Sequence, residues 1–263
     1  MEEVESHPDI ASLVFTSRTR LMLISVVNPN TTASMTAKIG AAARAAASPG
    51  VQIRAVNPEF GTPSIEGYFD EAFAVPGLLA EMAKARGSDA FVVGCFDDTG
   101  LEAARCATVS PVVGIGEAAF HMASLIADKF SVVTTLPRSI APIEKNLVKY
   151  GLAARCARVR AANVQVLALE EPGSDARRKI EAEISRALVE DGAEAIVLGC
   201  AGMTDLARDL GRKARVPVLD GVACAVGLAE TLIRLGLKTS KRNAYAPPLS
   251  KTYVGAFAEF SPR

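Results

Sequence analysis

An internal repeat constrains the fold of this chain more than any other feature. An apolar run that ends in Gly94 and Cys95 recurs as an apolar run that ends in Gly199 and Cys200, and a threonine lies four positions after each cysteine. A repeat of this kind predicts two copies of one structural unit, each of which ends a strand at a cysteine.

The segments around the repeat alternate between strand-like and helix-like patterns. Runs typical of strands occur at residues 21–27, 51–56, 88–95, 111–115, 130–133, 164–169, 192–200 and 216–219. Segments with apolar residues at helical spacing separate most of these runs. Strands that alternate with helices predict parallel sheets with right-handed crossovers. We therefore expect an α/β protein with two similar halves and mainly parallel sheets.

Residues that can bind or react fall at the carboxyl ends of four predicted strands. These residues are Asn28, Cys95, Thr135 and Cys200. Parallel α/β sheets bind their ligands at this end of the strands. If a pseudo-twofold axis relates the two halves, both sulfur atoms face one cleft, and we expect the active site in that cleft between the halves.

Composition favours a small molecule as the partner. Lys and Arg together number 29 and Asp and Glu also number 29 in the 263 residues, so no basic field favours nucleic acid. No apolar run reaches the roughly 20 residues that span a bilayer, and residues 1–20 form an acidic extension without the pattern of a secretory signal. Five cysteines without a CxxC pattern fit reduced thiols in the cytoplasm, and the two histidines have no metal-ligand spacing. We expect a cytoplasmic protein that binds no nucleic acid, no membrane and no metal.

The two repeated cysteines have a structural and a chemical interpretation. A free cysteine is most often a small buried apolar residue. A cysteine between a strand and the N-terminus of a helix, however, lies beside free N–H groups that lower the pKa of its thiol from about 8.5. Two such thiols on opposite sides of a cleft can invert a carbon acid, because one thiolate removes a proton from one face while the opposite thiol delivers a proton to the other.

An enolate formed in this way needs hydrogen-bond donors at its oxygen. The predicted strand ends offer glycines, which leave the backbone accessible, and polar side chains: Gly94, Gly199, Gly202, Asn28, Thr134 and Thr135. The adjacent Asp97 and Asp98 would face different ways as a pair of carboxylates, so a helix cap is their expected role.

Five motifs in this order resemble those of hydantoin racemases in the aspartate/glutamate racemase superfamily. They are Asn28-Pro29-Asn30-Thr31, Gly94-Cys95-Phe96-Asp97-Asp98-Thr99-Gly100-Leu101, Gly114-Ile115-Gly116-Glu117-Ala118-Ala119, Ser131-Val132-Val133-Thr134-Thr135 and Leu198-Gly199-Cys200-Ala201-Gly202-Met203. The resemblance covers about residues 21–255.

The resemblance implies a cofactor-independent racemase that inverts C5 of 5-substituted hydantoins or of allantoin, with Cys95 and Cys200 as the acid/base pair. It implies a substrate site lined by Asn28, Phe60, Gly61, Thr134 and Thr135, with the backbone of Phe96, Ala201 and Gly202 holding ring carbonyls. It also implies a small neutral cyclic ureide as the substrate and assembly as a homo-oligomer. Residues 21–117 with 223–263 would form the first half and residues 118–222 the second.

Other functions remain open at this point. The same superfamily contains amino-acid racemases, malonate decarboxylases and maleate-type isomerases, and a two-lobed α/β cleft also suits a non-catalytic ureide-binding module. The predicted strand ends carry Cys, Asn, Thr and Gly rather than Arg or Lys, with Arg138 as the exception. This pattern favours a neutral ligand over an amino acid or a dicarboxylate.

Overall fold

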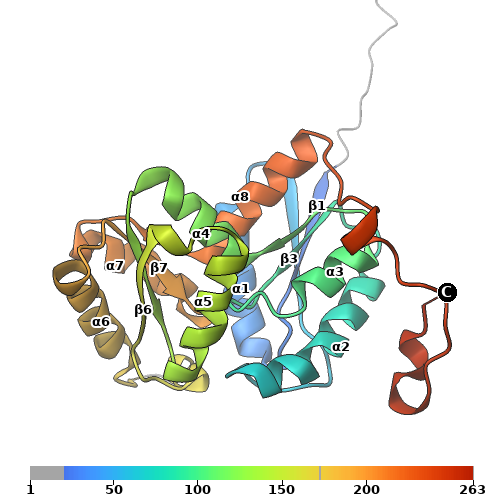
Figure 1. Ribbon diagram of the computed structural model, residues 1–263, viewed down its shortest axis with the longest axis horizontal. Coiled ribbons are helices and arrows are strands. Elements are labelled where there is room, and N and C mark those ends of the chain that lie inside the picture. The colour runs from blue at the N-terminus through green and yellow to red at the C-terminus, as the bar shows by residue number, and fades with distance from the viewer. Residues whose placement is uncertain (1–20, 172, 263) are drawn as a thin grey trace, which may run out of the picture.

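The computed structural model describes residues 21–171 and 173–262, and the predicted extension over residues 1–20 lies outside the described residues. Two four-stranded sheets lie side by side in this part of the chain (Figure 1). The first has the strand order β2-β1-β3-β4 and the second the order β6-β5-β7-β8, and every pair of neighbouring strands is parallel. The predicted fold class, two similar α/β halves with parallel sheets, is confirmed.

The two sheets are built from equivalent strands. The first contains β1 (Met22–Val27), β2 (Val51–Val56), β3 (Ala90–Val93) and β4 (Val112–Gly114), and the second contains β5 (Phe130–Thr134), β6 (Cys156–Ala161), β7 (Ala195–Gly199) and β8 (Val218–Leu219). The strands β3, β5 and β7 are buried at every position, which is typical of parallel strands with helices on both faces. Cys200 directly follows β7, and Cys95 follows β3 after one intervening residue, Gly94.

Helices cover the sheets and connect their strands. They are α1 (Ala33–Ala46), α2 (Tyr68–Lys84), α3 (Leu101–Ala107), α4 (Ile115–Ile126), α5 (Ile140–Lys149), α6 (Ala176–Glu190), α7 (Ala207–Ala214) and α8 (Gly221–Arg234). Short 3-10 helices are η2 (Pro137–Ser139), η3 (Ala153–Arg155), η4 (Val166–Leu169), η5 (Ala201–Leu206), η6 (Asn243–Tyr245) and η7 (Gly255–Phe260). Among the described helices, none combines the length and the apolar character that crossing a membrane requires.

One hydrophobic core joins the two sheets. A single cluster of buried side chains contains residues of β1 and β3 together with residues of β5 and β7, and α4 and α8 contribute more of the rest than any other element. Its centre is aromatic: the ring of Phe120 on α4 stacks on Phe130 of β5 at 6.1 Å and meets the edge of Phe96 at 5.4 Å. The predicted boundaries of the halves, residues 117 and 223, fall within α4 and α8, and these two helices pack against each other between the sheets. The core therefore does not separate the halves there, and the division stays a prediction.

The sixth strand differs from its prediction. Residues 164–169 were expected to form a strand, but the strand that pairs with β5 is Cys156–Ala161, and Val166–Leu169 is a 3-10 helix. Arg158 and Arg160 interrupt the apolar run by which a buried strand such as β6 is recognised in the sequence. Arg160 is 5% exposed and forms ion pairs with Asp191 and Glu190, which satisfy the charge that would otherwise oppose burial.

The shared core yields a prediction about stability. We expect Phe120→Ala to lower the free energy of unfolding by about 3–5 kcal/mol, because it removes the ring that packs against residues of both halves. As a matched control, Leu125→Ala on the same helix replaces a side chain that is 77% exposed and should change the free energy by less than about 0.5 kcal/mol. Urea unfolding followed by circular dichroism measures both values. A cost below about 1 kcal/mol for Phe120→Ala would contradict the proposed importance of this contact.

Candidate active site

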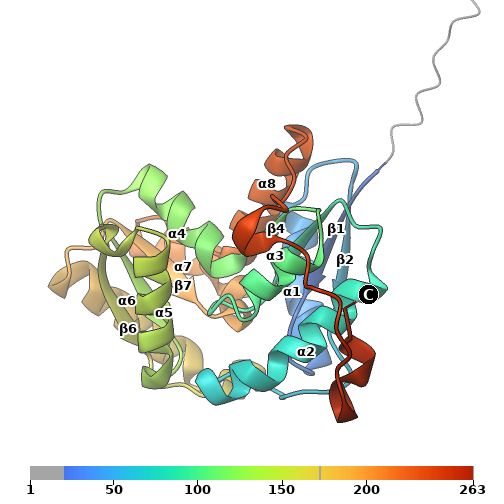
Figure 2. The ribbon, with the colours of Figure 1, turned by 45° about the vertical axis from the view of Figure 1, so that its right-hand side comes forward.

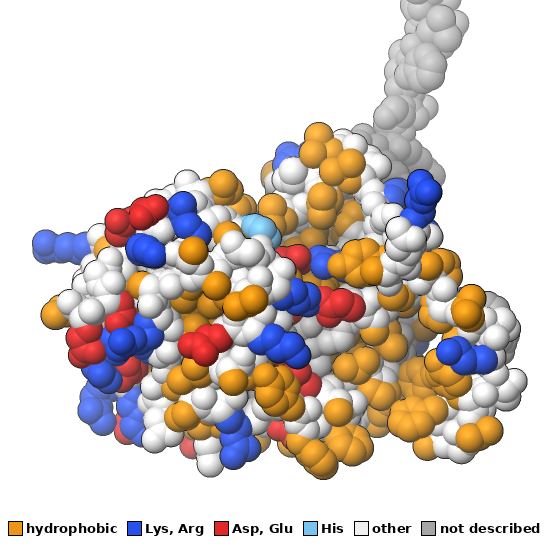
Figure 3. All heavy atoms as spheres, viewed as in Figure 1, with side chains coloured by type: hydrophobic (Ala, Val, Ile, Leu, Met, Phe, Trp, Pro, Cys, Tyr) orange, Lys and Arg blue, Asp and Glu red, His pale blue; other side chains and the backbone are white. Residues whose placement is uncertain are grey.

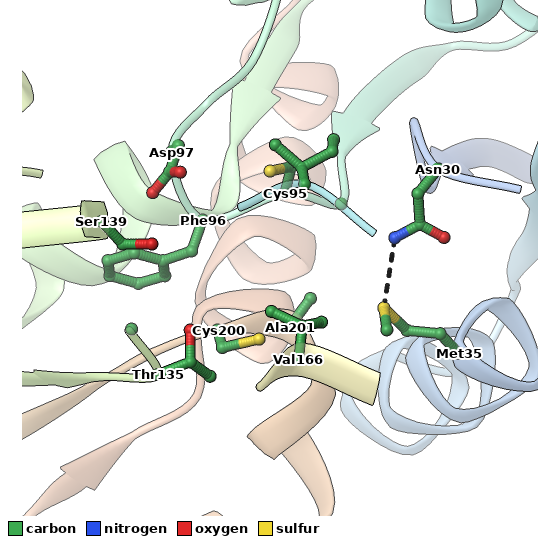
Figure 4. Close-up of a pocket in the computed structure, with 13 residues that line it drawn as sticks. Asn30, Met35, Cys95, Phe96, Asp97, Thr135, Ser139, Val166, Cys200 and Ala201 are labelled. Atoms are coloured by element: carbon green, nitrogen blue, oxygen red, sulfur yellow. Dashed lines mark hydrogen bonds between the residues drawn. The ribbon is translucent and has the colours of Figure 1, made fainter. Parts of the chain in front are cut away.

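A cavity at the carboxyl ends of β3 and β7 brings the two repeated cysteines together. Cys95 and Cys200 approach it from different sheets (Figure 4). The cavity is also lined by Asn30, Met35, Ile65, Gly94, Phe96, Asp97, Thr135, Ser139, Val166, Gly199 and Ala201. Its volume of about 30 Å³ is space for one or two water molecules and is too small for a hydantoin ring.

The turn after β3 holds Cys95 by its backbone. The N–H of Asp97 donates to the sulfur of Cys95, and the Sγ atom also shares a hydrogen bond of 3.4 Å with Thr99 Oγ1. The N–H of Asp98 donates to the carbonyl oxygen of Cys95 at 3.0 Å, which closes the turn. The sulfur is therefore fixed by the residues that follow it in the sequence.

The turn after β7 repeats this arrangement around Cys200. The N–H of Gly202, again two residues after the cysteine, donates to the sulfur. The N–H of Met203 donates to the carbonyl oxygen of Cys200 at 3.1 Å, as Asp98 does in the first turn. The equivalence that the sequence repeat predicted therefore extends to individual hydrogen bonds.

The predicted lowering of the thiol pKa is wrong. Burial is the largest influence on both thiols: it raises the pKa of Cys95 well above its ordinary value and that of Cys200 to about 12. The charge of Asp97 raises both values further, and the backbone N–H donors offset this only in part. The helix expected directly after Cys95 begins at Leu101, and the hydroxyl of Thr99 just before it shares the hydrogen bond with the sulfur.

The two adjacent aspartates face different ways, as expected. The helix cap was expected at the helix that follows them in the sequence, whereas Asp98 caps α4 instead. Asp98 has a positive φ of 52°, and its carboxylate accepts hydrogen bonds from the N–H groups of Gly116 and Glu117 at the start of α4 and from the hydroxyl of Tyr150. Burial raises the pKa of Asp98 to about 7, and these three donors oppose the rise. The side chain of Asp97 instead lines the cavity.

Of the predicted substrate-binding residues, three line the cavity and a fourth lies beside Cys200. Phe96, Thr135 and Ala201 belong to the lining, and Gly202 lies behind it as the N–H donor to Cys200. Thr134 is fully buried and donates its hydroxyl to the carbonyl oxygen of Gly199 at 2.9 Å, so it holds two strand ends together.

Asn28 has a supporting position. It is 1% exposed, and its amide donates to Asn30 Oδ1 at 2.9 Å and to Thr36 Oγ1 at 3.0 Å. Asn30 then lines the cavity and donates to Met35 Sδ at 3.3 Å (Figure 4). The second asparagine of the Asn-Pro-Asn motif is the one that reaches the site.

Phe60 and Gly61 lie at a different cavity. This second cavity has a volume of about 610 Å³ and lies between α2, the loop around Gly61 and the C-terminal segment with η7, which Figure 2 shows beside α2. Its aromatic lining consists of Phe60, Phe69, Phe73, Phe257 and Phe260. The structure therefore places Phe60 and Gly61 at this second cavity, whereas Ile65 of the same loop lines the cavity of the cysteines.

Residues that the sequence reasoning missed include Asn30, Met35, Ile65, Asp97, Ser139 and Val166. Ile65 and Val166 lie in the segments that follow the edge strands β2 and β6, at corresponding places in the two halves. The repeat could have indicated such a pair only if β6 had been identified. Among the described residues, no group of three or more His, Cys, Asp or Glu side chains is placed to hold a metal ion.

The first half holds a segment of the second half that contributes Val166 to the cavity lining. Glu66 Oε1 accepts a hydrogen bond of 3.0 Å from the N–H of Val166. Lys38 on α1 forms an ion pair of 2.9 Å with Glu170 and donates to the carbonyl oxygen of Leu169 at 3.3 Å. Because the cavity has no room for a ring, part of its lining must move before a substrate can bind, and this contact holds one lining residue, Val166.

Comparison with known proteins identifies close relatives of the chain. The family model described as Asp/Glu/Hydantoin racemase matches residues 24–229. A hydantoin racemase from Rhizobium meliloti is 49% identical over 89% of this chain and 98% of its own length, and one from Pseudomonas sp. (strain NS671) is 46% identical over 91% and 97%. The solved structure of an allantoin racemase from Klebsiella pneumoniae is 49% identical and superposes with a TM-score of 0.89 over 92% of this chain and 100% of that one.

The cross-half contact at Val166 yields a prediction about local opening. We expect Glu66→Ala to speed hydrogen exchange at the Val166 amide by about tenfold, because the variant removes the carboxylate that accepts this N–H. The control Glu59→Ala changes an exposed carboxylate in the same loop and should leave that rate unchanged. Amide exchange followed by mass spectrometry or NMR measures the effect. Equal protection of Val166 in both variants would show that Glu66 does not hold the segment.

The raised thiol pKa yields a prediction about reactivity. Since alkylation requires the thiolate and the pKa of Cys200 is about 12, its alkylation rate should rise about tenfold per pH unit from pH 7 through pH 9. Iodoacetamide labelling, quantified on the Cys200 peptide, measures the rate, with glutathione as the reference thiol. A rate that levels off below about pH 9 would indicate a thiol without the predicted shift.

Proposed function

Because the chain belongs to the Asp/Glu/hydantoin racemase family, we propose that it is an isomerase that inverts C5 of 5-substituted hydantoins, allantoin included. One observation carries the proposal: two cysteines from equivalent turns of the two halves line one cavity, and each sulfur accepts an N–H from the residue two positions later. Inversion requires a base on one face of a carbon and an acid on the other, and this arrangement supplies both.

In the proposed reaction, one cysteine acts as a thiolate and the other as a thiol. The thiolate takes the C5 proton, so that the C5–H bond breaks and an S–H bond forms. The opposite thiol then gives its proton to the other face of C5 and becomes the thiolate. The two proton transfers balance without an electron acceptor, which supports a cofactor-independent mechanism. The high thiol pKa makes each thiolate a strong base, although it lowers the thiolate fraction at neutral pH.

The lining of the cavity supports a neutral ligand. Among the described lining residues there is no Lys or Arg, so no cation is placed to bind a carboxylate. Asn30, Thr135 and Ser139 offer donors and acceptors that suit the amide groups and the developing enolate of a cyclic ureide. Arg138 is not part of the lining. These features favour a hydantoin over an amino acid or a dicarboxylate.

Location and assembly are further parts of the proposal. All five cysteines are free, which supports a reducing, cytoplasmic location. Hydrophobic side chains gather over α2 and the C-terminal segment, in the lower centre and right of Figure 3. On these two elements Phe69 is 77% and Phe257 is 53% exposed. Exposed aromatic groups of this kind support assembly into a homo-oligomer.

Racemisation of enantiopure hydantoins in deuterium oxide tests the proposed function. We expect the wild-type enzyme to abolish the optical rotation of at least one substrate among allantoin and hydantoins with small, aliphatic or aromatic C5 substituents, with deuterium entering C5. Cys95→Ser and Cys200→Ser should each reduce racemisation by about 100-fold or more. The pKa of a serine hydroxyl is far above that of a thiol, so the hydroxyl neither ionises to act as the base nor readily donates its proton. Polarimetry and mass spectrometry give both quantities.

The control for these variants is Cys106→Ser on α3, a cysteine that does not line the cavity. It should retain wild-type activity. Full activity in Cys95→Ser or in Cys200→Ser would contradict the two-thiol mechanism. Unchanged rotation of every substrate by the wild-type enzyme would contradict racemase activity and favour a ureide-binding module.

A further inference from the structure

The proposed two-thiol reaction leaves the enzyme in a different protonation state from the one in which it began. The cysteine that was a thiolate ends as a thiol, and the other ends as a thiolate. An enzyme in that state is ready only for the opposite enantiomer. When one enantiomer is in excess, a proton must therefore move from one sulfur to the other between turnovers. The inference below rests on the proposed function and concerns the group that carries this proton.

Asp97 is the titratable side chain that shares the cavity with both thiols. It lines the same cavity as Cys95 and Cys200, and Figure 4 shows its carboxylate beside that cavity. Its charge acts on both cysteines, since it raises the pKa of each. Among the described lining residues, Asp97 is the only carboxylate and there is no histidine.

The backbone fixes Asp97 while its carboxylate stays unpaired. Asn146 of α5 donates its amide to the carbonyl oxygen of Asp97 at 2.8 Å, and the N–H of Asp97 is bound to the sulfur of Cys95. The positive φ of Asp98 turns that neighbour toward α4, away from the cavity. Within the described part of the chain, the Asp97 carboxylate has no hydrogen-bond partner, so it is available to exchange protons.

The carboxylate also breaks the symmetry of the repeat. The two turns correspond residue by residue, and the position that holds Asp97 in the first turn holds Gly202 in the second. The backbone function of this position, an N–H bound to the cysteine sulfur, is the same in both turns. A side chain at that position therefore serves a purpose other than holding its own cysteine.

We propose that Asp97 carries the proton that resets the two cysteines between turnovers. The protonated carboxyl gives its proton to the thiolate: an O–H bond breaks, an S–H bond forms and the negative charge moves to Asp97. The carboxylate then takes the proton of the other thiol, so that the charge passes to the second sulfur and the O–H bond is restored. No net proton is gained or lost, and no further reactant is needed.

The acidity of Asp97 suits this role. Burial, together with the nearby carboxylates of Glu71 and Asp98, raises its pKa to about 8. Both forms of the carboxyl are therefore populated at neutral to mildly alkaline pH, as a proton carrier requires. An ordinary aspartate would be almost entirely ionised there and would have no proton to give.

Comparison of two rates in Asp97→Asn tests the proposal. The first is net racemisation of saturating, enantiopure 5-isopropylhydantoin or allantoin, whichever the wild-type enzyme converts faster. The second is the exchange of a carbonyl-carbon isotope label between the two enantiomers of the same compound in its racemic mixture. Net conversion of one enantiomer needs the reset, whereas exchange in a racemic mixture does not, because alternate turnovers in opposite directions restore the thiols.

We expect Asp97→Asn to lower the ratio of net racemisation to exchange by about 100-fold, because loss of the charge acts on both rates through the thiol pKa values, whereas loss of the proton carrier acts on the net rate alone. Asp97→Glu should recover part of the net rate. As a control, Ser139→Ala removes another polar group of the lining, and it should lower both rates by the same factor. Chiral chromatography with mass spectrometry gives both rates.

Two results would overturn the assignment. Equal slowing of both rates in Asp97→Asn would indicate a binding or structural role, and an unchanged net rate would indicate that solvent resets the thiols. Both outcomes leave the two-thiol racemase intact. Failure of the wild-type enzyme to racemise any substrate, or full activity in the cysteine variants, would instead refute the proposed function itself.

Discussion

The close approach of neighbouring strands at their carboxyl ends is the constraint on which the site depends. A Cβ atom at Gly199 would lie 2.8 Å from the Cβ of Thr134 and would clash, and one at Gly94 would lie 3.2 Å from the carbonyl oxygen of Val27 and would be crowded, so glycine suits the position before each cysteine. The N–H of Gly94 donates to that carbonyl oxygen at 2.8 Å. The chain can then turn out of the sheet at the next residue, and the turn brings an N–H to the cysteine sulfur. The geometry of the sheet edge thus places both thiols.

The two turns are equivalent at the sulfur but differ in how they are anchored. Through Asp98, the first turn is tied to the start of α4 and, by the hydroxyl of Tyr150, to the end of α5 in the second half. Such buried contacts belong to the stable part of a protein. The segment that contributes Val166 to the lining is held to the first half by hydrogen bonds at Val166 and Leu169 and by the partly exposed ion pair of Lys38, which contribute little. The turn that carries Cys95 should therefore stay fixed while this segment moves.

The sequence predicted the parts of this protein that local chemistry determines. The repeat, the parallel sheets and the meeting of Cys95 with Cys200 all follow from apolar runs that end at a glycine and a cysteine. Strand β6 was missed because the burial of Arg160 depends on its partner Asp191, which lies far away in the sequence. The direction of the Asp97 side chain depends on the positive φ of its neighbour, and the rise in thiol pKa depends on burial by other segments. Neither property is a feature of a short motif.

Closure of the cavity and the strength of the proposed base are parts of one physical effect. Burial is the largest cause of the raised pKa of both thiols, and the cavity that produces this burial has no room for a ring. In the proposed reaction, opening would admit substrate and water together and would move each thiol toward its ordinary pKa, at which the thiolate forms more readily. Closing over the substrate would remove that water and make the thiolate a stronger base. Apolar lining residues such as Ile65 and Val166 would then contribute to the proposed proton abstraction although they exchange no proton themselves.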